Sequence, residues 1–382
     1  MDQAKFKLPP GVPPLGTIYL YPTDRCNLNC NHCWVAPQQI QTIDEYIERI
    51  KAREITIDQI KDTFIKARDI GCHSVKFTGG EPLLRDDTPE LMRWMKEQNI
   101  SMTIETNGTL IDEKMAKTLK EVGMRHVAIS LDGPNAEIHD RLRGQPGAFE
   151  QTVQGIKNSV KAGMGVQIIM SLYTDNENLI ESTVQLAIQL GANSFKINPV
   201  IPSGRALSVA KESRIVPVVR LMHLYKYVYQ ILMPKYRFRI FFSVPTGLKD
   251  FREIVSHTGE CHIHFICGLM GNGDISICGI GRTEPELIMG NIKKDDIRDV
   301  WVNGPIFKKI REDIPNNLKG ICSRCIFKAK CLGSCLAITY AMTGEINNGY
   351  WFCEEADRLG LFPESRKFVA EPSQVASPVC SE

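Results

Sequence analysis

Long apolar runs are missing from the 382-residue sequence, so it predicts no membrane-spanning helix. The first residues, MDQAKFKLPPGVPPLG, lack an apolar core, which argues against a secretory signal. An excess of one charge is also missing, because 46 basic and 44 acidic side chains give a formal net charge of +2. This balance argues against a nucleic acid or an anionic membrane as partner. We therefore expect a cytoplasmic protein that binds neither.

The cysteine content is the unusual feature of the composition. The chain has 13 cysteines in an otherwise ordinary globular sequence with 43% hydrophobic and 24% charged residues. A reducing compartment disfavours a disulfide framework, and an odd number cannot pair fully within one chain. So many thiols in such a compartment indicate metal or cluster ligation. Cys72 and Cys380 stand apart from the cysteine-rich motifs, and we interpret them as a small buried residue and an inert tail residue.

Short apolar segments alternate with amphipathic segments over the first two-thirds of the chain. Thr56 and Gln59 predict a capping box for one helix that ends near Gly71, and Asn176 predicts the start of another that ends at Gly191. Strands separated by helices pair in parallel, so we expect an α/β sheet curled towards a barrel, with functional loops after the strands. The predicted strands are 17–21, 73–78, 101–106, 126–131, 166–172 and 193–200.

The domain organisation follows from shifts in composition. PSGRA at 202–206 marks a boundary, and a long helix over 209–233 and a strand near 236–243 follow it. From about residue 259 cysteine and glycine become dense, as in a small domain held together by metal sites. We predict an N-terminal segment (1–16), a partial barrel (17–205), a connecting region (206–258), a cysteine-rich domain (259–355) and a C-terminal tail (356–382).

The first cysteine motif, DRCNLNCNHCW, follows the first predicted strand. Cys26, Cys30 and Cys33 have the spacing CxxxCxxC, which allows three thiolates to bind one iron–sulfur cluster and leave a fourth iron open. A zinc site completed by His32 or by a distant residue is the alternative. The spacing alone favours the cluster.

Polar loops follow the next three strands. TGGEP (78–82) comes after the second, ETNG (105–108) ends the third, and SLDG (130–133) ends the fourth, with Arg141 and Arg143 shortly after it. Loops after parallel strands meet at one end of a barrel, so these residues predict a ligand site with a polar lining. TGGEP read alone favours a simple turn.

Together, these motifs over residues 17–205 resemble the radical S-adenosylmethionine (SAM) enzymes. The resemblance implies a partial (β/α)6 barrel with a [4Fe–4S] cluster on Cys26, Cys30 and Cys33, whose open iron binds SAM. One departure is His32, because many members carry Tyr or Phe there, packed near the adenine. The resemblance implies that SAM is contacted by Gly79, Gly80 and Glu81 at its amino group, by Ser130 and Asp132 at its carboxylate or ribose, by Arg143 at its carboxylate, and by Asn107 in the same pocket.

The C-terminal cysteines form a second array, which read alone fits either zinc or iron–sulfur clusters. His262 and His264 alternate in a strand-like run and are interpreted as surface residues. The pattern resembles the SPASM domain of radical SAM enzymes, which implies two auxiliary [4Fe–4S] clusters and three clusters in all. The implied outer ligands are Cys322, Cys325, Cys331 and Cys353, and the inner ones are Cys261, Cys278, Cys335 and, as the least secure assignment, Cys267. Without Cys267 the inner cluster would have an open iron.

The resemblance predicts a peptide-modifying oxidoreductase. It would cleave SAM to a 5′-deoxyadenosyl radical that abstracts hydrogen from a ribosomally made peptide and so installs a thioether or carbon–carbon cross-link. Gly279 follows Cys278 where sulfatase-maturing members carry an acidic residue, which argues against that reaction, and CNHCW resembles the subgroup of SynChlorMet-type cassettes. The expected partners are a small precursor peptide, a flavodoxin- or ferredoxin-type electron donor and a separate leader-recognition protein. The alternatives are a radical SAM enzyme of a cofactor precursor or other non-peptide substrate, and a non-catalytic iron–sulfur or zinc protein.

Overall fold

One mixed sheet runs through the part of the chain that the computed structural model describes, residues 8–35, 44, 48, 50–256 and 261–368. The strand order is β10-β9-β8-β1-β2-β3-β4-β5-β6-β7. The strands are β1 (Thr17–Leu20), β2 (Ser74–Phe77), β3 (Ser101–Thr106), β4 (His126–Ser130), β5 (Gly165–Leu172), β6 (Ser194–Pro199), β7 (Arg239–Phe242), β8 (Ile266–Leu269), β9 (Asp274–Ser276) and β10 (Ile288–Asn291).

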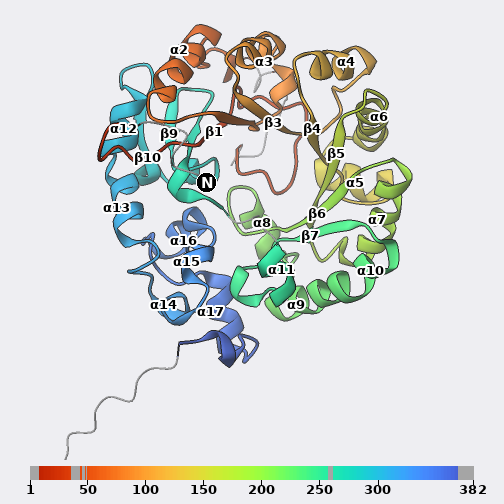
Figure 1. Ribbon diagram of the computed structural model, residues 1–382. Helices are drawn as coiled ribbons and strands as arrows, with labels where there is room; N and C mark the ends of the chain where they lie inside the picture. The colour runs from red at the N-terminus through yellow and green to blue at the C-terminus, as the bar shows by residue number, and fades with distance from the viewer. Residues whose placement is uncertain (1–7, 36–43, 45–47, 49, 257–260, 369–382) are drawn as a thin grey trace, which may run out of the picture.

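The predicted α/β barrel architecture is confirmed. Strands β1 to β7 pair in parallel in sequence order, and each of the six predicted strand segments overlaps one of β1 to β6, with β5 beginning one residue before its predicted segment, at Gly165. The strand predicted near 236–243 is β7. Figure 1 shows this sheet curling around an open centre, with helices on its outside.

Helices connect the parallel strands and cover the outer face of the sheet. The capping box predicted for α2 is present, because Thr56 and Gln59 exchange hydrogen bonds of 3.2 and 2.9 Å. Within the described residues no helix is long and apolar enough to cross a bilayer. The barrel helices are α2 (Ile57–Arg68), α3 (Thr88–Glu97), α4 (Glu113–Glu121), α5 (Ala136–Arg143), α6 (Ala148–Lys161) and α7 (Ile180–Gln189).

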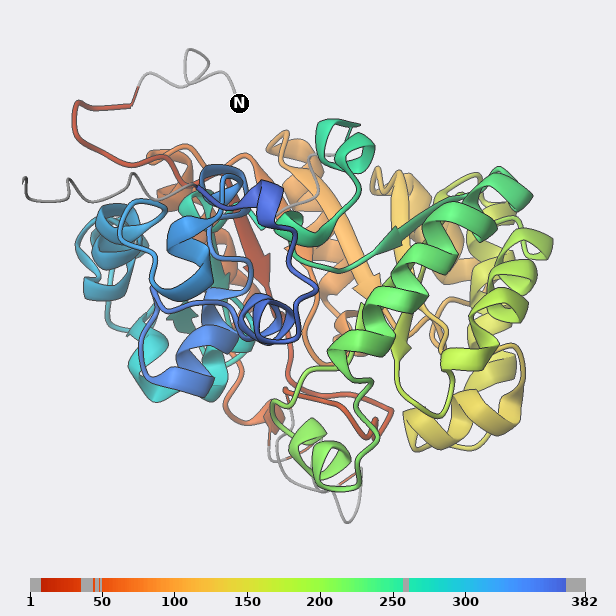
Figure 2. The same ribbon diagram turned by 90° about the horizontal axis from the view of Figure 1, so that it is seen from below.

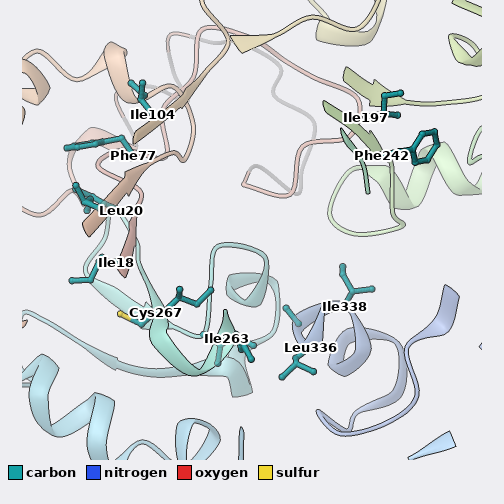
Figure 3. Packing of buried hydrophobic residues seen from close by; sticks show 14 of the residues in the cluster. Ile18, Leu20, Phe77, Ile104, Ile197, Phe242, Ile263, Cys267, Leu336 and Ile338 are labelled. Atoms are coloured by element: carbon teal, nitrogen blue, oxygen red, sulfur yellow. The ribbon is translucent and has the colours of Figure 1, made fainter. Parts of the chain in front are cut away.

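The two faces of the sheet differ in polarity because side chains alternate along each strand. On the outer face, Ile18, Phe77 and Ile197 are fully buried beneath the helices. On the inner face, Tyr19 and Lys76 lie opposite each other and are only partly buried. The hydrophobic core therefore lies between sheet and helices, and the inner face carries polar groups. Figure 3 shows part of the core layer.

The connecting region differs from the single long helix predicted over 209–233. α8 (Ala206–Lys211) ends early, and Pro217 precedes a separate helix, α9 (Val218–Tyr227). Proline lacks a backbone donor and restricts the residue before it, so it begins a helix more readily than it continues one. α10 (Met233–Tyr236) and α11 (Phe251–Ser256) follow, on either side of β7.

The cysteine-rich segment adds directly to the barrel sheet. β8 pairs in parallel with β1, and β9 and β10 continue the sheet in antiparallel order. The sequence did not predict this pairing. α17 also packs against α9, so the C-terminal segment lies beside both ends of the curled sheet (Figure 1). The remaining helices are α12 (Ile297–Asn303), α13 (Pro305–Asp313), α14 (Gly320–Arg324), α15 (Lys328–Cys331), α16 (Leu336–Thr343) and α17 (Trp351–Arg358).

Candidate active site

The first cysteine motif forms a loop directly after β1. Cys26, Cys30 and Cys33 are free thiols of intermediate exposure. The backbone N–H of Cys33 donates to the carbonyl of Cys30 at 3.3 Å, and that of Leu28 donates to the Cys26 sulfur at 3.4 Å. Burial raises the pKa of Cys26 and that of Cys30. Thiolates in this loop therefore need a compensating positive charge, which a bound metal cluster supplies.

The GGEP loop after β2 pairs with the backbone of the cysteine loop. The N–H of Gly80 donates to the Thr23 carbonyl at 3.1 Å, and that of Glu81 donates to the Arg25 carbonyl at 2.7 Å. A Cβ at Gly80 would lie 2.1 Å from the Arg25 oxygen, and Gly79 has a φ of +127°. The glycines thus permit a close approach between two loops, in addition to the approach to a ligand that the sequence suggests.

Glu81 connects the GGEP loop to the end of β3. Its fully buried carboxylate accepts hydrogen bonds from Thr106 Oγ1 at 2.7 Å, Asn107 N at 2.8 Å and Leu83 N at 3.1 Å. Burial raises the pKa of Glu81 despite these donors. Both carboxylate oxygens are engaged within the protein, so Glu81 fixes the shape of the loop.

Asn107 lies against the cysteine loop, as the predicted pocket requires. Its Nδ2 donates to Asn27 Oδ1 at 2.9 Å and lies 4.0 Å from the Cys26 sulfur. Ser130, the last residue of β4, is half-buried and makes no side-chain hydrogen bond with the described residues. Its hydroxyl is therefore available to a ligand.

A buried ion pair lies beside Cys30. Asp132 is fully buried, and its carboxylate pairs with the Arg143 guanidinium at 2.8 and 3.0 Å. Arg143 Nη1 also lies 3.8 Å from the Cys30 sulfur. Burial opposes ionisation of Asp132, but Arg143 together with other neighbouring groups, among them the backbone N–H of Ser171, outweighs it and lowers the pKa of that carboxyl. A permanently charged guanidinium therefore stands next to the first cysteine motif.

His32, which departs from the Tyr or Phe of many family members, is held through both of its ring nitrogens. Its Nδ1 contacts the Tyr173 hydroxyl, its Nε2 lies 3.3 Å from Ser171 Oγ, and the His32 and Tyr173 rings meet edge-on at 5.7 Å. Burial, and next Arg143, lower the pKa of His32 to about 4, so its ring is neutral. Tyr173 and Ser171 belong to the end of β5, which sequence reasoning had not connected with the cysteines.

Three further residues of the site were not found from sequence. Asn176, predicted as the start of a helix, does precede the short helix Glu177–Leu179 that leads into α7, but its side chain makes no cap hydrogen bond there. Its Nδ2 donates to the carbonyls of Asp132 at 2.8 Å and Ser171 at 2.9 Å. Arg205, in the presumed boundary segment PSGRA, donates its N–H to the Cys33 carbonyl at 3.0 Å. Figure 2 shows α8, which begins after this residue, beside the cysteine loop. Arg282, after β9, forms an ion pair with Asp24 at 2.5 and 2.6 Å. Asparagines and arginines are too common for such roles to be visible in sequence.

The predicted outer cysteine set surrounds a cavity. Cys322, Cys325, Cys331 and Cys353 all line one small, partly open cavity of about 10 Å³, together with mainly apolar side chains. Backbone N–H groups donate to two of the sulfurs, Cys322 and Cys325, at 3.4 Å each. Burial raises the pKa of Cys322 to about 12. Four buried thiols around one cavity suit a cluster, because each thiolate can bind a different iron.

A structural zinc ion is the alternative occupant of these thiols. A single zinc ion needs its four ligands converged at about 2.0–2.3 Å from one point. Within the described ranges, no three His, Cys, Asp or Glu side chains are grouped closely enough to hold one metal ion. The outer cysteines as placed therefore do not form a ready single-metal site.

The structure does not bring the predicted inner set fully together. Cys278 lies close enough to raise the pKa of Cys335 and that of Tyr19 on the inner face. Cys261 also raises the pKa of Tyr19. Cys267 instead pairs with Ile18, whose side chain belongs to the opposite, helix-covered face. Figure 3 shows it among the core side chains.

Cys72 and Gly279 agree with their interpretation from sequence. Cys72 is buried and 2% exposed, and Cys380 lies outside the described residues. At Gly279, a Cβ would lie 1.4 Å from the Tyr21 hydroxyl. Tyr21 therefore occupies the space in which an acidic side chain would lie.

Comparisons with known proteins agree with this geometry. The profile of the radical SAM superfamily matches residues 20–187, and that of SPASM, an iron–sulfur cluster-binding domain, matches residues 261–326. An AdoMet-dependent heme synthase from Methanosarcina barkeri is 31% identical over 334 residues, which cover 85% of this chain and 91% of the relative. The chain belongs to the radical SAM superfamily. This radical SAM protein is thus an enzyme of SAM and a [4Fe–4S] cluster, with a C-terminal SPASM domain that implies further iron–sulfur clusters.

Other similar proteins include a maturase and a protein solved with its precursor peptide. The mycofactocin maturase MftC of Mycobacterium tuberculosis is 27% identical over 83% of the chain and 77% of the relative. Among solved structures, Streptococcus suis SuiB bound to its precursor peptide SuiA has a TM-score of 0.68 at 18% identity, covering 90% of this chain and 76% of SuiB. That likeness supports the fold.

Proposed function

We propose that this radical SAM protein uses Cys26, Cys30 and Cys33 to hold its catalytic [4Fe–4S] cluster. The observation that carries the proposal is that these three thiols lie in one loop, which the GGEP backbone and the Asp132–Arg143 pair contact directly. When bound, the reduced cluster supplies an electron that cleaves SAM to a 5′-deoxyadenosyl radical, which removes hydrogen from an unactivated carbon.

The protein's own residues position SAM and keep the site ordered. Arg143 provides a fixed cation for the methionine carboxylate, and Asp132 holds the guanidinium in place. The available Ser130 hydroxyl contacts the carboxylate or ribose, and Asn107 lines the same pocket. Carbonyls of the GGEP loop accept from the SAM amino group, because the Glu81 carboxylate is already engaged.

The SPASM cysteines hold two auxiliary clusters in this proposal, three clusters in all. Cys322, Cys325, Cys331 and Cys353 bind the outer cluster, as their shared cavity supports. Cys261, Cys278 and Cys335 bind the inner one, which then has an iron without a cysteine ligand. The donor that reduces the clusters is a flavodoxin- or ferredoxin-type protein, and we propose the cytoplasm as the compartment.

The substrate class favoured by the relatives is a cofactor precursor of the porphyrin type. The heme synthase aligns over 91% of its own length with the higher identity, whereas the mycofactocin maturase aligns over 77%. A ribosomally made peptide that receives a cross-link is the second candidate, because a SPASM maturase also aligns over most of the chain. In that case a separate leader-recognition protein would assist.

Anaerobic reconstitution tests the catalytic assignment. We expect about 12 irons per wild-type chain and about 8 after Cys26, Cys30 and Cys33 are changed to Ala, with SAM cleavage abolished. If dithionite-reduced wild-type protein leaves SAM intact, the non-catalytic alternative holds. Zinc in the C-terminal domain would overturn the auxiliary assignment.

Product analysis separates the two substrate classes. The reconstituted enzyme is incubated with SAM and either an iron porphyrin bearing propionate side chains or a short peptide encoded beside its gene. Formation of 5′-deoxyadenosine together with a mass change in the porphyrin supports the first class, and a loss of two hydrogens from the peptide supports the second.

A further inference from the structure

The inner face of the barrel sheet carries a row of charged side chains that the proposed SAM and cluster sites do not use. Lys76 on β2, Glu105 on β3 and Lys196 on β6 all lie on this face. Lys76 pairs with Tyr19 and Lys196 pairs with Ile169, and the register of the strands between them keeps these residues on the same face of the sheet. Lys76 and Glu105 remain 25% and 33% exposed although they lie on central strands. Solvent therefore reaches the middle of the inner face.

Only part of this charge is compensated within the protein. Lys76 pairs with Glu105 at 2.6 Å and lies 5.0 Å from the centre of the Tyr19 ring. Lys196, in contrast, makes no ion pair or hydrogen bond through its side chain with the described residues. Burial lowers the pKa of Lys196, with Lys76 and Lys249 acting in the same direction and Glu105 against them. Lys196 is only half-buried, so its ammonium group is open to an anionic ligand.

The position of Lys196 fits a substrate contact. Its neighbours in the register are Ile169 on β5 and Phe241 on β7, two apolar side chains that can pack against the body of a ligand. Cys261 of the proposed inner cluster lies near enough to affect the pKa of Lys196. A ligand held here would lie inside the curled sheet, beneath the loops that contact SAM.

We propose that Lys196 binds a carboxylate of the substrate on the inner face of the barrel. This inference rests on the proposed function and specifies the substrate as an acid. Both candidate classes can supply the carboxylate, since heme-type porphyrins carry propionates and peptides carry acidic side chains. Lys196 is a binding residue, and it takes no part in SAM cleavage.

The test measures binding to the reconstituted holoenzyme with SAM present. Two probes represent the two sources: hemin against its dimethyl ester, and an acidic peptide against its fully methylated form. We expect at least one free acid to bind at least ten times more tightly than its ester, and Lys196→Met to abolish that preference. Lys196→Arg should retain it, because the charge remains. Lys117→Met is the matched control, as Lys117 is 78% exposed on α4, outside the barrel.

Each outcome decides the inference. A preference for free hemin alone supports a porphyrin acid, and one for the free peptide alone supports a peptide acid. Equal binding of acid and ester for both probes, or a preference that survives in Lys196→Met, overturns the proposal. If Lys196 instead serves the inner cluster, Lys196→Met shifts the cluster's reduction potential and leaves the preference intact. SAM cleavage by the wild-type protein is measured separately, and its absence would contradict the proposed function.

Discussion

Cys267 on β8 lies directly opposite Ile18 on β1 in the parallel pairing of these strands. Paired residues on neighbouring strands point to the same face, and Ile18 is fully buried beneath the helices. Burial, and then the Cys72 thiol, raise the pKa of Cys267, which keeps it protonated. Cys267 thus belongs to the hydrophobic core.

The first prediction concerns the iron content of cysteine variants. Cys267→Ala should keep the wild-type iron content and lose about 1–2 kcal/mol of stability through a lost core contact. Cys335→Ala should lose about four irons. Iron and sulfide analysis after reconstitution measures both. Equal iron losses in the two variants would mean that Cys267 is a ligand.

The second prediction tests the contact between the GGEP and cysteine loops. Gly80→Ala places a methyl group 2.1 Å from the Arg25 carbonyl oxygen, so the loops must separate. We expect SAM affinity and cleavage to fall at least tenfold, because small displacements in an active site have large effects on rate. Gly344→Ala is the control, because Gly344 has a φ of +73° and open space around it. This substitution should lower the free energy of unfolding by about 1 kcal/mol and leave SAM binding and cleavage unchanged. Unchanged SAM binding in Gly80→Ala would contradict the expectation.

The third prediction concerns the buried Asp132–Arg143 pair. Asp132→Asn or Arg143→Met leaves one buried charge without its partner, which should destabilise the protein by about 3–5 kcal/mol. The double variant should lose clearly less free energy of unfolding than the sum of the losses in the two single variants. Urea unfolding of all four proteins measures this coupling. Additive effects would show that the pair contributes little.

The fourth prediction is an acid sensitivity due to His139. His139 is 1% exposed, its Nδ1 accepts from Asp132 N at 3.1 Å, and burial lowers its pKa to about 4. Between pH 6.5 and 4 the unfolded chain binds a proton at this residue that the folded chain does not. The free energy of unfolding therefore falls with falling pH, by up to about 1.4 kcal/mol per pH unit.

Chemical unfolding at about pH 7 and pH 5 checks this expectation. His139→Asn keeps an acceptor for Asp132 N but does not titrate in this range. Its stability should depend less on pH than that of the wild type, whatever its stability at neutral pH. Identical pH dependence in the two proteins would exclude His139 as the source.

The sequence was sufficient where local patterns decide the outcome. Short apolar runs bounded by turn residues located the parallel strands, and the pair Thr56–Gln59 located the start of α2. It was insufficient where a residue's role depends on distant contacts. Asn176 resembles a helix cap locally, but its amide binds two carbonyls at the ends of β4 and β5.

Dependence on distant contacts also explains why the sequence could not assign Cys267 and Lys196 at the candidate site. The spacing of Cys267 to Cys261 and Cys278 resembles a ligand pattern, but only strand pairing decides which face of the sheet it occupies. Likewise, Lys196 is an ordinary lysine in sequence, and its position on the inner face of the sheet depends on the parallel register of β5, β6 and β7.

The pairing of β8 with β1 also affects how the protein can be divided. A fragment ending before β8 would leave the full length of β1 as an open edge, with unpaired N–H and C=O groups beside the cysteine loop. Exposed edges of this kind recruit other strands and cause aggregation. The barrel and the SPASM domain should therefore unfold as one cooperative unit, and isolated barrel domains should be recovered only as insoluble material.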